Sequence, residues 1–224
     1  MPGLVHDLDA MRDAVTERTR LVFLPNPNNP TGTALPAAEV AAFARSLPEW
    51  VVFCYDEAYV EYEEDRLEVA SLIAEGVRIV GTRTFSKIFG LAALRIGYGY
   101  ADVELAALLN RVRSPFNTGS VAQAAACAAL TEANWEEDCR RANAAGRVQL
   151  REGLEGMGLE AFGEHGNFVL IRVSGAGRLA AALQSAGVIV RPLGGYGLPE
   201  HLRITIGTPE QNQRLLDALR VVRN

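Results

Sequence analysis

The sequence predicts an α/β fold with a mainly parallel sheet, followed by a smaller C-terminal α+β unit. The apolar run at residues 21–24 is continuous rather than alternating, which is typical of a parallel strand covered on both faces. A run at 50–55 repeats the arrangement, a third strand is expected at 77–84, and helical patterns separate the three. In an open α/β sheet, ligands bind beyond the carboxyl ends of the strands. The polar residues that follow these runs are therefore the candidate site.

Composition excludes several classes of protein. The 224 residues are 49% hydrophobic with a net charge of -5 and a pI near 5.3, so a nucleic-acid partner has no basic patch to bind. The three cysteines form no CxxC pair and the three histidines lack metal-ligand spacing, so we expect a reducing compartment and no metal. A signal peptide and a membrane-spanning run are also missing, and these features together predict a cytoplasmic protein without a membrane partner.

The first predicted strand leads into a stiff polar loop. A helix is expected at 7–19, a strand at 19–25 and a further helix at 36–47, begun by Pro36. Between them, residues 26–33 contain two prolines that restrict the backbone and Gly32, which permits a tight bend. Asn29 in this loop is well placed to hydrogen-bond a ligand, although a plain connecting loop explains the same residues.

The second predicted strand, at 50–59, ends in three polar or aromatic residues, Asp56, Glu57 and Tyr59. An acidic side chain at the end of a buried strand is unfavourable unless a positive group meets it, so a cation should lie nearby. The alternative is that Asp56 caps the following helix.

The third predicted strand, at 77–84, leads into Lys87. A lysine nucleophile needs burial or cationic neighbours that lower its pKa, and Arg83 and Arg95 are the candidate neighbours. In an extended segment Thr84 and Ser86 point to the same side, so with Arg95 they form a plausible phosphate site. The alternative is that Lys87 ends a strand in solvent.

The remaining sequence predicts the end of the sheet and a second unit. A strand at 96–100 and helices at 103–113 and 121–132 complete the first domain, residues 1–132. The loop between these helices contains Asn117 and is explained by a helix-breaking turn, whereas the family resemblance given below implies that Asn117 lines a substrate pocket. The second domain, residues 133–224, is expected to contain helices at 135–157, 177–186 and 209–222 and strands at 167–173, 188–191 and 202–206.

Three segments together resemble a known family. They are Asn26-Pro-Asn-Asn-Pro-Thr-Gly32, Tyr55-Asp-Glu-Ala-Tyr59 and Thr84-Phe-Ser-Lys-Ile-Phe-Gly-Leu-Ala-Ala-Leu-Arg-Ile-Gly97, and they resemble the signatures of class I/II aminotransferases, which have the aspartate aminotransferase fold and use pyridoxal phosphate. Within that superfamily the chain most resembles the histidinol-phosphate aminotransferases, through residues 23–33, 167–170, 190–199 and 202–208. The resemblance implies a pyridoxal-phosphate-dependent transferase fold in which residues 1–132 are part of the large domain.

The resemblance also implies how the cofactor ring is held. Lys87 would bind the cofactor covalently and later move the proton between substrate and cofactor carbons. Asp56 would face the pyridine nitrogen and keep it protonated. Asn29 and Tyr59 would hydrogen-bond the phenolic oxygen, and Asn29 would also lie at the substrate.

The phosphate and substrate sites follow from the same resemblance. Thr84, Ser86 and Arg95 match the positions that anchor the cofactor phosphate. Arg203 matches the arginine that binds the substrate carboxylate, and strand alternation places it with Thr205 opposite the apolar residues of 202–206. Arg191 is a second basic group, expected at the substrate's phosphate end.

Three functions stay open at this point. The first is transfer of an amino group between histidinol phosphate and 2-oxoglutarate in histidine biosynthesis, by a protein that is a homodimer at full length. The second is the same chemistry on another amino acid, such as an aromatic one, or decarboxylation of a phosphorylated amino acid. The third is an inactive fragment that acts through association. The family carries a long segment before the position of Asp7, so a sheet without it is expected to expose an unpaired edge and apolar faces.

Overall fold

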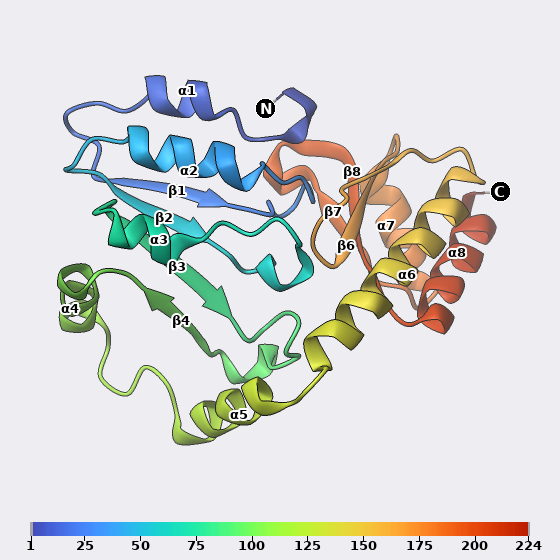
Figure 1. Ribbon diagram of the computed structural model, residues 1–224. Coiled ribbons are helices and arrows are strands. Elements are labelled where there is room, and N and C mark those ends of the chain that lie inside the picture. Colours follow the sequence, from blue (N-terminus) through green and yellow to red (C-terminus); the bar gives the residue numbers. More distant parts are fainter. Residues whose placement is uncertain (1, 224) are drawn as a thin grey trace. The chain divides into compact units, whose positions relative to one another are not determined.

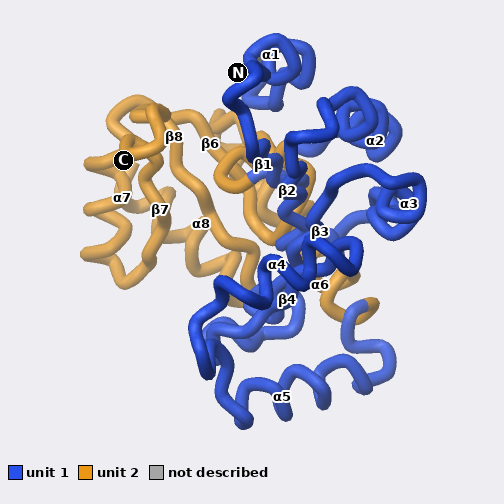
Figure 2. The backbone as a smooth tube through the Cα atoms, turned by 90° about the vertical axis from the view of Figure 1, so that its left-hand side faces the viewer, with its two compact units in different colours: residues 1–28, 34–136 blue, residues 29–33, 137–224 orange. Residues whose placement is uncertain are grey.

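The computed structural model describes residues 2–223, which form two compact units. Among the described residues, the first unit contains 2–28 and 34–136, and the second contains 29–33 and 137–223 (Figure 2). The short segment 29–33 therefore leaves the first unit and belongs to the second. No helix among the described residues is both long and apolar enough to cross a lipid bilayer.

The first unit is built on a four-stranded sheet (Figure 1). Its strands, in spatial order, are β1 (Leu21–Pro25), β2 (Val52–Asp56), β3 (Ile79–Thr84) and β4 (Gly97–Tyr100). β1, β2 and β3 run parallel and β4 is antiparallel to β3, which confirms the predicted mainly parallel sheet. Because Asp56 is opposite Thr82, the carboxyl ends of β2 and β3 lie side by side.

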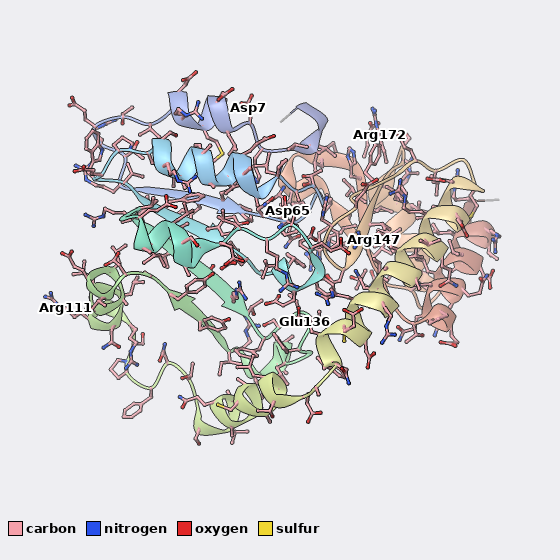
Figure 3. The ribbon with its side chains drawn as sticks, in the orientation of Figure 1. Asp7, Asp65, Arg111, Glu136, Arg147 and Arg172 are labelled. Atoms are coloured by element: carbon pink, nitrogen blue, oxygen red, sulfur yellow. The ribbon has the colours of Figure 1, made fainter. Side chains whose placement is uncertain are left out.

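Three helices, at residues 8–13, 37–46 and 69–74, pack on one face of this sheet (Figure 1). The helices of the unit are α1 (Leu8–Asp13), α2 (Ala37–Ser46), α3 (Val69–Ala74), α4 (Val103–Val112) and α5 (Ser120–Thr131), with 3-10 turns η1 (Pro2–Leu4), η2 (Val60–Tyr62) and η3 (Ala92–Leu94). Phe43 of α2 and Phe53 of β2 pack edge to face at 5.6 Å between ring centroids in the largest core cluster of the unit. α2 begins after Pro36, and Asp65 accepts the Ala37 N–H at 2.9 Å (Figure 3).

Two predictions for the first unit are wrong. The helix expected at 7–19 begins after its N-cap Asp7 (Figure 3) but ends at Asp13. Thr16 and Thr19 bond to each other instead, with the Thr16 N–H donating to Thr19 Oγ1 at 2.9 Å, and such side-chain bonds compete with a helix. The expectation that β1 is covered on both faces also fails, because Leu21 and Phe23 are 53% and 66% exposed.

The second unit is an antiparallel sheet with helices. α6 (Trp135–Glu155) starts in the first unit, and then follow β5 (Ala161–Phe162), β6 (Phe168–Arg172), α7 (Ala176–Ser185), β7 (Arg191–Leu193), η4 (Gly194–Tyr196), β8 (Leu198–Thr205) and α8 (Pro209–Arg223). The strand order is β5-β6-β8-β7. In β8, Leu202 and Ile204 are buried while Arg203 is not, so the predicted alternation is confirmed.

The strand expected at 188–191 starts only at Arg191. Val188 instead closes the end of α7, since its N–H donates to Leu183 O at 2.9 Å and Gly187 before it has a positive φ of 75°. This is the Schellman arrangement, in which the residue after the glycine still bonds to the helix. β5 was not expected. β8 starts at Leu198, four residues before the predicted Leu202, because Leu198 pairs with Leu193 of β7 across the turn η4.

Candidate active site

Asp56 is the last residue of β2, and its carboxylate is exposed. Its Oδ1 accepts the Ala58 N–H at 3.0 Å, a turn that aspartate readily forms at the end of a strand. The alternative in which Asp56 caps the next helix is wrong, because η2 has Tyr59 as its N-cap residue. Asp56 therefore presents a negative charge beyond the carboxyl end of the sheet.

Lys87 and Tyr59 meet beyond the ends of β3 and β2. Lys87 Nζ lies 5.0 Å from the centroid of the Tyr59 ring, and Tyr59 is only 4% exposed. Lys87 is partly buried, so the alternative of a lysine fully in solvent does not describe it. Within residues 2–223, its amine has no hydrogen bond or ion pair. Lys87 is also the only lysine among the 224 residues of the sequence.

Thr84, Ser86 and Arg95 form a basic, hydroxyl-rich corner after β3. The Ser86 N–H donates to Thr84 Oγ1 at 3.0 Å, and Arg95 NH1 donates to Ser86 Oγ at 3.3 Å. The expected extended backbone is wrong here, because residues 85–86 form a turn. Arg95 has a left-handed backbone with φ 51°, an uncommon conformation for a residue other than glycine and one found at functional sites.

Asn29, Arg191 and Arg203 lie in the second unit. Arg203 NH1 donates to Asn29 Oδ1, and the Arg203 guanidinium stacks 5.1 Å from the centroid of the Phe168 ring. Arg191 of β7 is directly opposite Arg203 of β8. Like charges at opposite positions are destabilising unless an anion neutralises them, so this pair is suited to bind an anionic group.

The six residues of the first unit fit pyridoxal phosphate by their chemistry. The cofactor offers a basic ring nitrogen, a phenolic oxygen, an aldehyde and a phosphate, and the unit offers a carboxylate, a phenol, a free amine and a cationic hydroxyl cluster. These groups are Asp56, Tyr59, Lys87 and the corner of Thr84, Ser86 and Arg95. Within the part of the chain that the structure describes, no cluster of His, Cys, Asp and Glu could hold a metal ion.

Comparison with known proteins identifies the family. The family model for aminotransferase class I and II matches residues 2–219. The chain belongs to this family. It is 50% identical over 216 residues to histidinol-phosphate aminotransferase 1 of Dechloromonas aromatica. The matched residues are 96% of this chain and 60% of that relative.

Solved aminotransferases share the fold. The histidinol-phosphate aminotransferase of Sinorhizobium meliloti, in complex with pyridoxal-5'-phosphate, superposes with a TM-score of 0.87 at 31% identity, over 96% of this chain and 62% of that one. An aspartate aminotransferase double mutant of Thermus thermophilus gives a TM-score of 0.85 at 29% identity. This match covers 99% of this chain and 62% of that one. The fold is thus aspartate aminotransferase-like, and the chain spans about 60% of the length of the curated relative.

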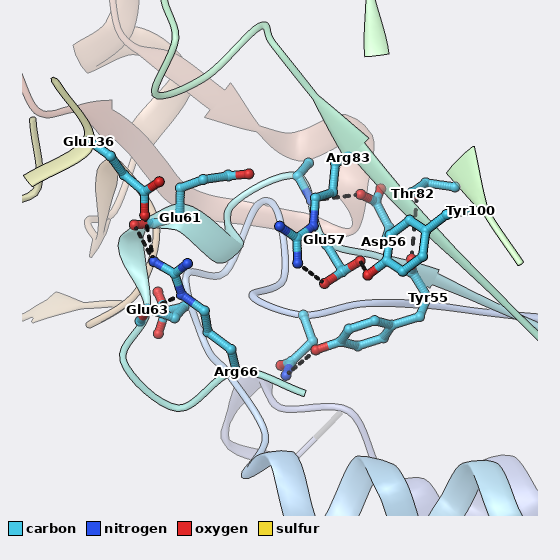
Figure 4. Close-up of polar contacts among 12 residues, drawn as sticks. Tyr55, Asp56, Glu57, Glu61, Glu63, Arg66, Thr82, Arg83, Tyr100 and Glu136 are labelled. Carbon is cyan, nitrogen blue, oxygen red and sulfur yellow. Dashed lines mark hydrogen bonds and ion pairs between the residues drawn. The ribbon is translucent and has the colours of Figure 1, made fainter. Parts of the chain in front are cut away.

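A buried ionic network, not predicted from the sequence, lies beside the candidate site (Figure 4). Glu57 is fully buried, Arg83 NH2 lies 3.0 Å from its Oε1, and the Tyr100 hydroxyl donates to its Oε2. The cation expected at the end of β2 therefore meets Glu57 rather than Asp56. Arg83, expected as a neighbour of Lys87, is bound to Glu57 instead. Strand alternation was the available signal, because it points Glu57 away from Asp56.

Glu61 of η2 is a second buried acid, shown with the network in Figure 4. Burial raises the pKa of Glu61 to about 7, although the nearby Arg83 and Arg66 oppose this shift. Arg66 is occupied by an ion pair with Glu136 at 2.7 Å and donates to the Glu61 backbone carbonyl at 3.2 Å. Glu61 Oε2 has no hydrogen-bond partner among the described residues.

We expect Glu61→Gln to change how stability depends on pH. Because the folded pKa lies above the unfolded value of 4.5, the folded state binds the extra proton, and stability falls as pH rises from about 4.5 to 7. Above pH 7 the substitution should raise the free energy of unfolding by up to roughly 3 kcal/mol and remove that fall. Urea unfolding at pH 5 and pH 8 measures both effects. The exposed Glu68→Gln is the control, and an unchanged pH dependence in Glu61→Gln would contradict the assignment.

Proposed function

We propose that this chain is part of a pyridoxal-phosphate-dependent aminotransferase that converts histidinol phosphate and 2-oxoglutarate to imidazole acetol phosphate and glutamate, in histidine biosynthesis. The observation that carries the proposal is the 50% identity to a histidinol-phosphate aminotransferase over 96% of the chain. The family match from residue 2 to 219 includes every candidate site residue.

Three residues of the first unit act on the reacting end of the cofactor. When bound, pyridoxal phosphate supplies a ring that takes up the electron pair of the substrate's Cα–H bond. Asp56 holds a proton on the ring nitrogen through its exposed carboxylate. Tyr59 donates a hydrogen bond to the phenolic oxygen, and Asn29 is proposed to donate a second. Lys87 attaches the cofactor and, once released by the incoming amine, carries the proton at Nζ.

The remaining residues fix the anionic groups. Thr84 and Ser86 donate hydroxyl hydrogen bonds to the cofactor phosphate, and Arg95, already directed at Ser86 Oγ, neutralises it. Arg203 binds the substrate carboxylate with its planar fork, whose orientation is fixed by Asn29 and by the Phe168 ring. Arg191, directly opposite Arg203 in the sheet, is assigned to the substrate's phosphate end.

We expect Arg203→Lys to lower kcat/KM for 2-oxoglutarate by about 10- to 100-fold, because lysine cannot make the bidentate bond to a carboxylate. Initial rates at varied 2-oxoglutarate concentration measure the effect. Arg172→Lys is the matched control, since Arg172 is exposed on β6 of the same sheet and pairs with Glu200. Equal losses in the two variants would show that Arg203 does not bind the carboxylate of 2-oxoglutarate.

The proposed function is tested by supplying the purified full chain with pyridoxal phosphate and 2-oxoglutarate. Histidinol phosphate should give glutamate faster than phenylalanine or aspartate, and no carbon dioxide should form. A preference for phenylalanine or aspartate, release of carbon dioxide, or the absence of any transfer would each contradict it.

The full-length protein is further proposed to be a cytoplasmic homodimer. Large apolar side chains at 112–121 support association, since Val112, Phe116 and Val121 are 81%, 97% and 73% exposed. Sedimentation equilibrium tests this assembly, and a monomer at micromolar concentration would contradict it.

A further inference from the structure

The network of Glu57, Arg83 and Tyr100 joins three strands beside the candidate active site. Glu57 directly follows β2, Arg83 is in β3 and Tyr100 ends β4 (Figure 4). Its members are sequence neighbours of site residues: Glu57 follows Asp56, and Arg83 precedes Thr84. A shift of the network would therefore move the cofactor-facing residues.

A glycine makes room for this arrangement. Gly81 of β3 is directly opposite both Tyr55 of β2 and Tyr100 of β4. A Cβ at Gly81 would lie 2.6 Å from Tyr100 Cζ and 2.8 Å from Glu57 Oε2, closer than real side chains approach. The Tyr100 hydroxyl can reach the Glu57 carboxylate only because this position has no side chain. Beside it, the Glu57 N–H donates to Thr82 O at 2.9 Å, so the backbone also links β2 to β3.

Stability alone does not require these charges. Replacing a buried ion pair by neutral side chains of similar volume is often neutral or stabilising, whereas removing one partner leaves a buried charge uncompensated. The guanidinium and carboxylate differ from apolar residues mainly in their directional bonds, which fix the strand ends in one relative position.

We propose that Glu57, Arg83 and Tyr100 are positioning residues that hold Asp56 and Tyr59, beyond β2, at the correct place relative to Thr84 and Lys87, beyond β3. The inference rests on the proposed function, because its purpose is to align the two groups of cofactor-binding residues. None of the three is assigned a contact with cofactor or substrate.

The chain contains its own reporter of this alignment. Lys87, which follows β3, lies 5.0 Å from the ring of Tyr59, which follows β2. Since Lys87 is the only lysine, reductive methylation with ¹³C-formaldehyde labels only its amine and the chain's N-terminal amine. A methyl group over an aromatic ring has a shifted NMR signal, and the shift changes when the ring moves. The signal therefore reports the relation of the two strand ends without any cofactor.

The test compares the wild-type chain with the double variant Glu57→Gln/Arg83→Met, which removes both charges without leaving one unpaired. Arg45→Met/Glu75→Gln is the matched control, since it neutralises the exposed ion pair of the same unit, 2.6 Å long. Three quantities are measured for each: the unfolding midpoint in urea, the methyl signal of Lys87, and the Kd for pyridoxal phosphate. Tyr59→Leu identifies the ring contribution to the signal.

We expect the Glu57/Arg83 double variant to remain folded, with its Lys87 signal moved toward that of Tyr59→Leu and its Kd raised about 10- to 100-fold, as expected for a misplacement near 1 Å. The control variant Arg45→Met/Glu75→Gln should match wild type in its unfolding midpoint, its Lys87 methyl signal and its Kd. An unmoved signal with an unchanged Kd in a folded double variant would overturn the inference, and so would a double variant that cannot fold, since the charges would then serve stability. If wild type binds no pyridoxal phosphate, the proposed function fails, and the Lys87 signal alone still decides whether the network aligns the strand ends.

Discussion

We expect Lys87→Ala to abolish covalent attachment of pyridoxal phosphate and to lower amino transfer by at least about 10⁴-fold. The substitution removes both the nucleophile and the group that carries the proton, and a positioned acid–base group alone contributes about 10²- to 10⁴-fold. No other lysine is present in the chain to replace it. The fold should be retained, because the Lys87 amine has no hydrogen bond or ion pair within residues 2–223.

The absorption spectrum of the variant with pyridoxal phosphate should be that of the free aldehyde, while wild type shows the band of the attached cofactor. Glutamate formation is then measured with both proteins, and circular dichroism confirms that each is folded. A folded Lys87→Ala chain with the wild-type spectrum, or with more than about one hundredth of the wild-type rate, would show that another group performs the chemistry.

Asp56→Asn is expected to have the second largest effect, a loss of about 10³-fold in amino transfer. The amide cannot supply the negative charge that keeps the ring nitrogen protonated, and preorganised electrostatic groups of this kind contribute about 10²- to 10³-fold each. Asparagine keeps the local structure, since its side-chain oxygen can still accept the Ala58 N–H that Asp56 accepts at 3.0 Å. The loss therefore reports charge rather than folding.

Asp65→Asn is the matched control for this variant. Asp65 is an aspartate of the same unit that accepts the backbone N–H of Ala37, the first residue of α2, at 2.9 Å. Initial rates with saturating pyridoxal phosphate should fall only for Asp56→Asn. A normal rate in that variant, or an equal fall in both, would remove Asp56 from the proposed site.

The sequence predicted elements whose signals are local. Buried apolar stretches located β1 and β2, and alternation in β8 separated Arg203 from the buried Leu202 and Ile204. The errors arise where neighbouring bonds override the pattern. Val188 has the composition of a strand residue, but its N–H completes the end of α7.

The parts of the site that escaped prediction depend on contacts between distant residues. Glu57 is separated from Arg83 by 26 residues and from Tyr100 by 43, so no local pattern joins them. Trp135 is a similar case, because its indole N–H donates to Ile88 O at 2.9 Å and supports the loop of Lys87 across 47 residues. Asn29 was predicted to join Asp56 and Lys87, and this convergence stays a prediction, since the structure places Asn29 with Arg203 in the second unit.

The central claim is that Lys87 is the amine of a pyridoxal phosphate site. The most direct test is to add pyridoxal phosphate to the purified chain, reduce with borohydride and map the modified peptides. The account predicts one label for each chain, on the peptide that contains Lys87. Because the chain has only one lysine, the N-terminal amine is the only competing aliphatic amine. A label found there alone, or no label at all, would contradict the account.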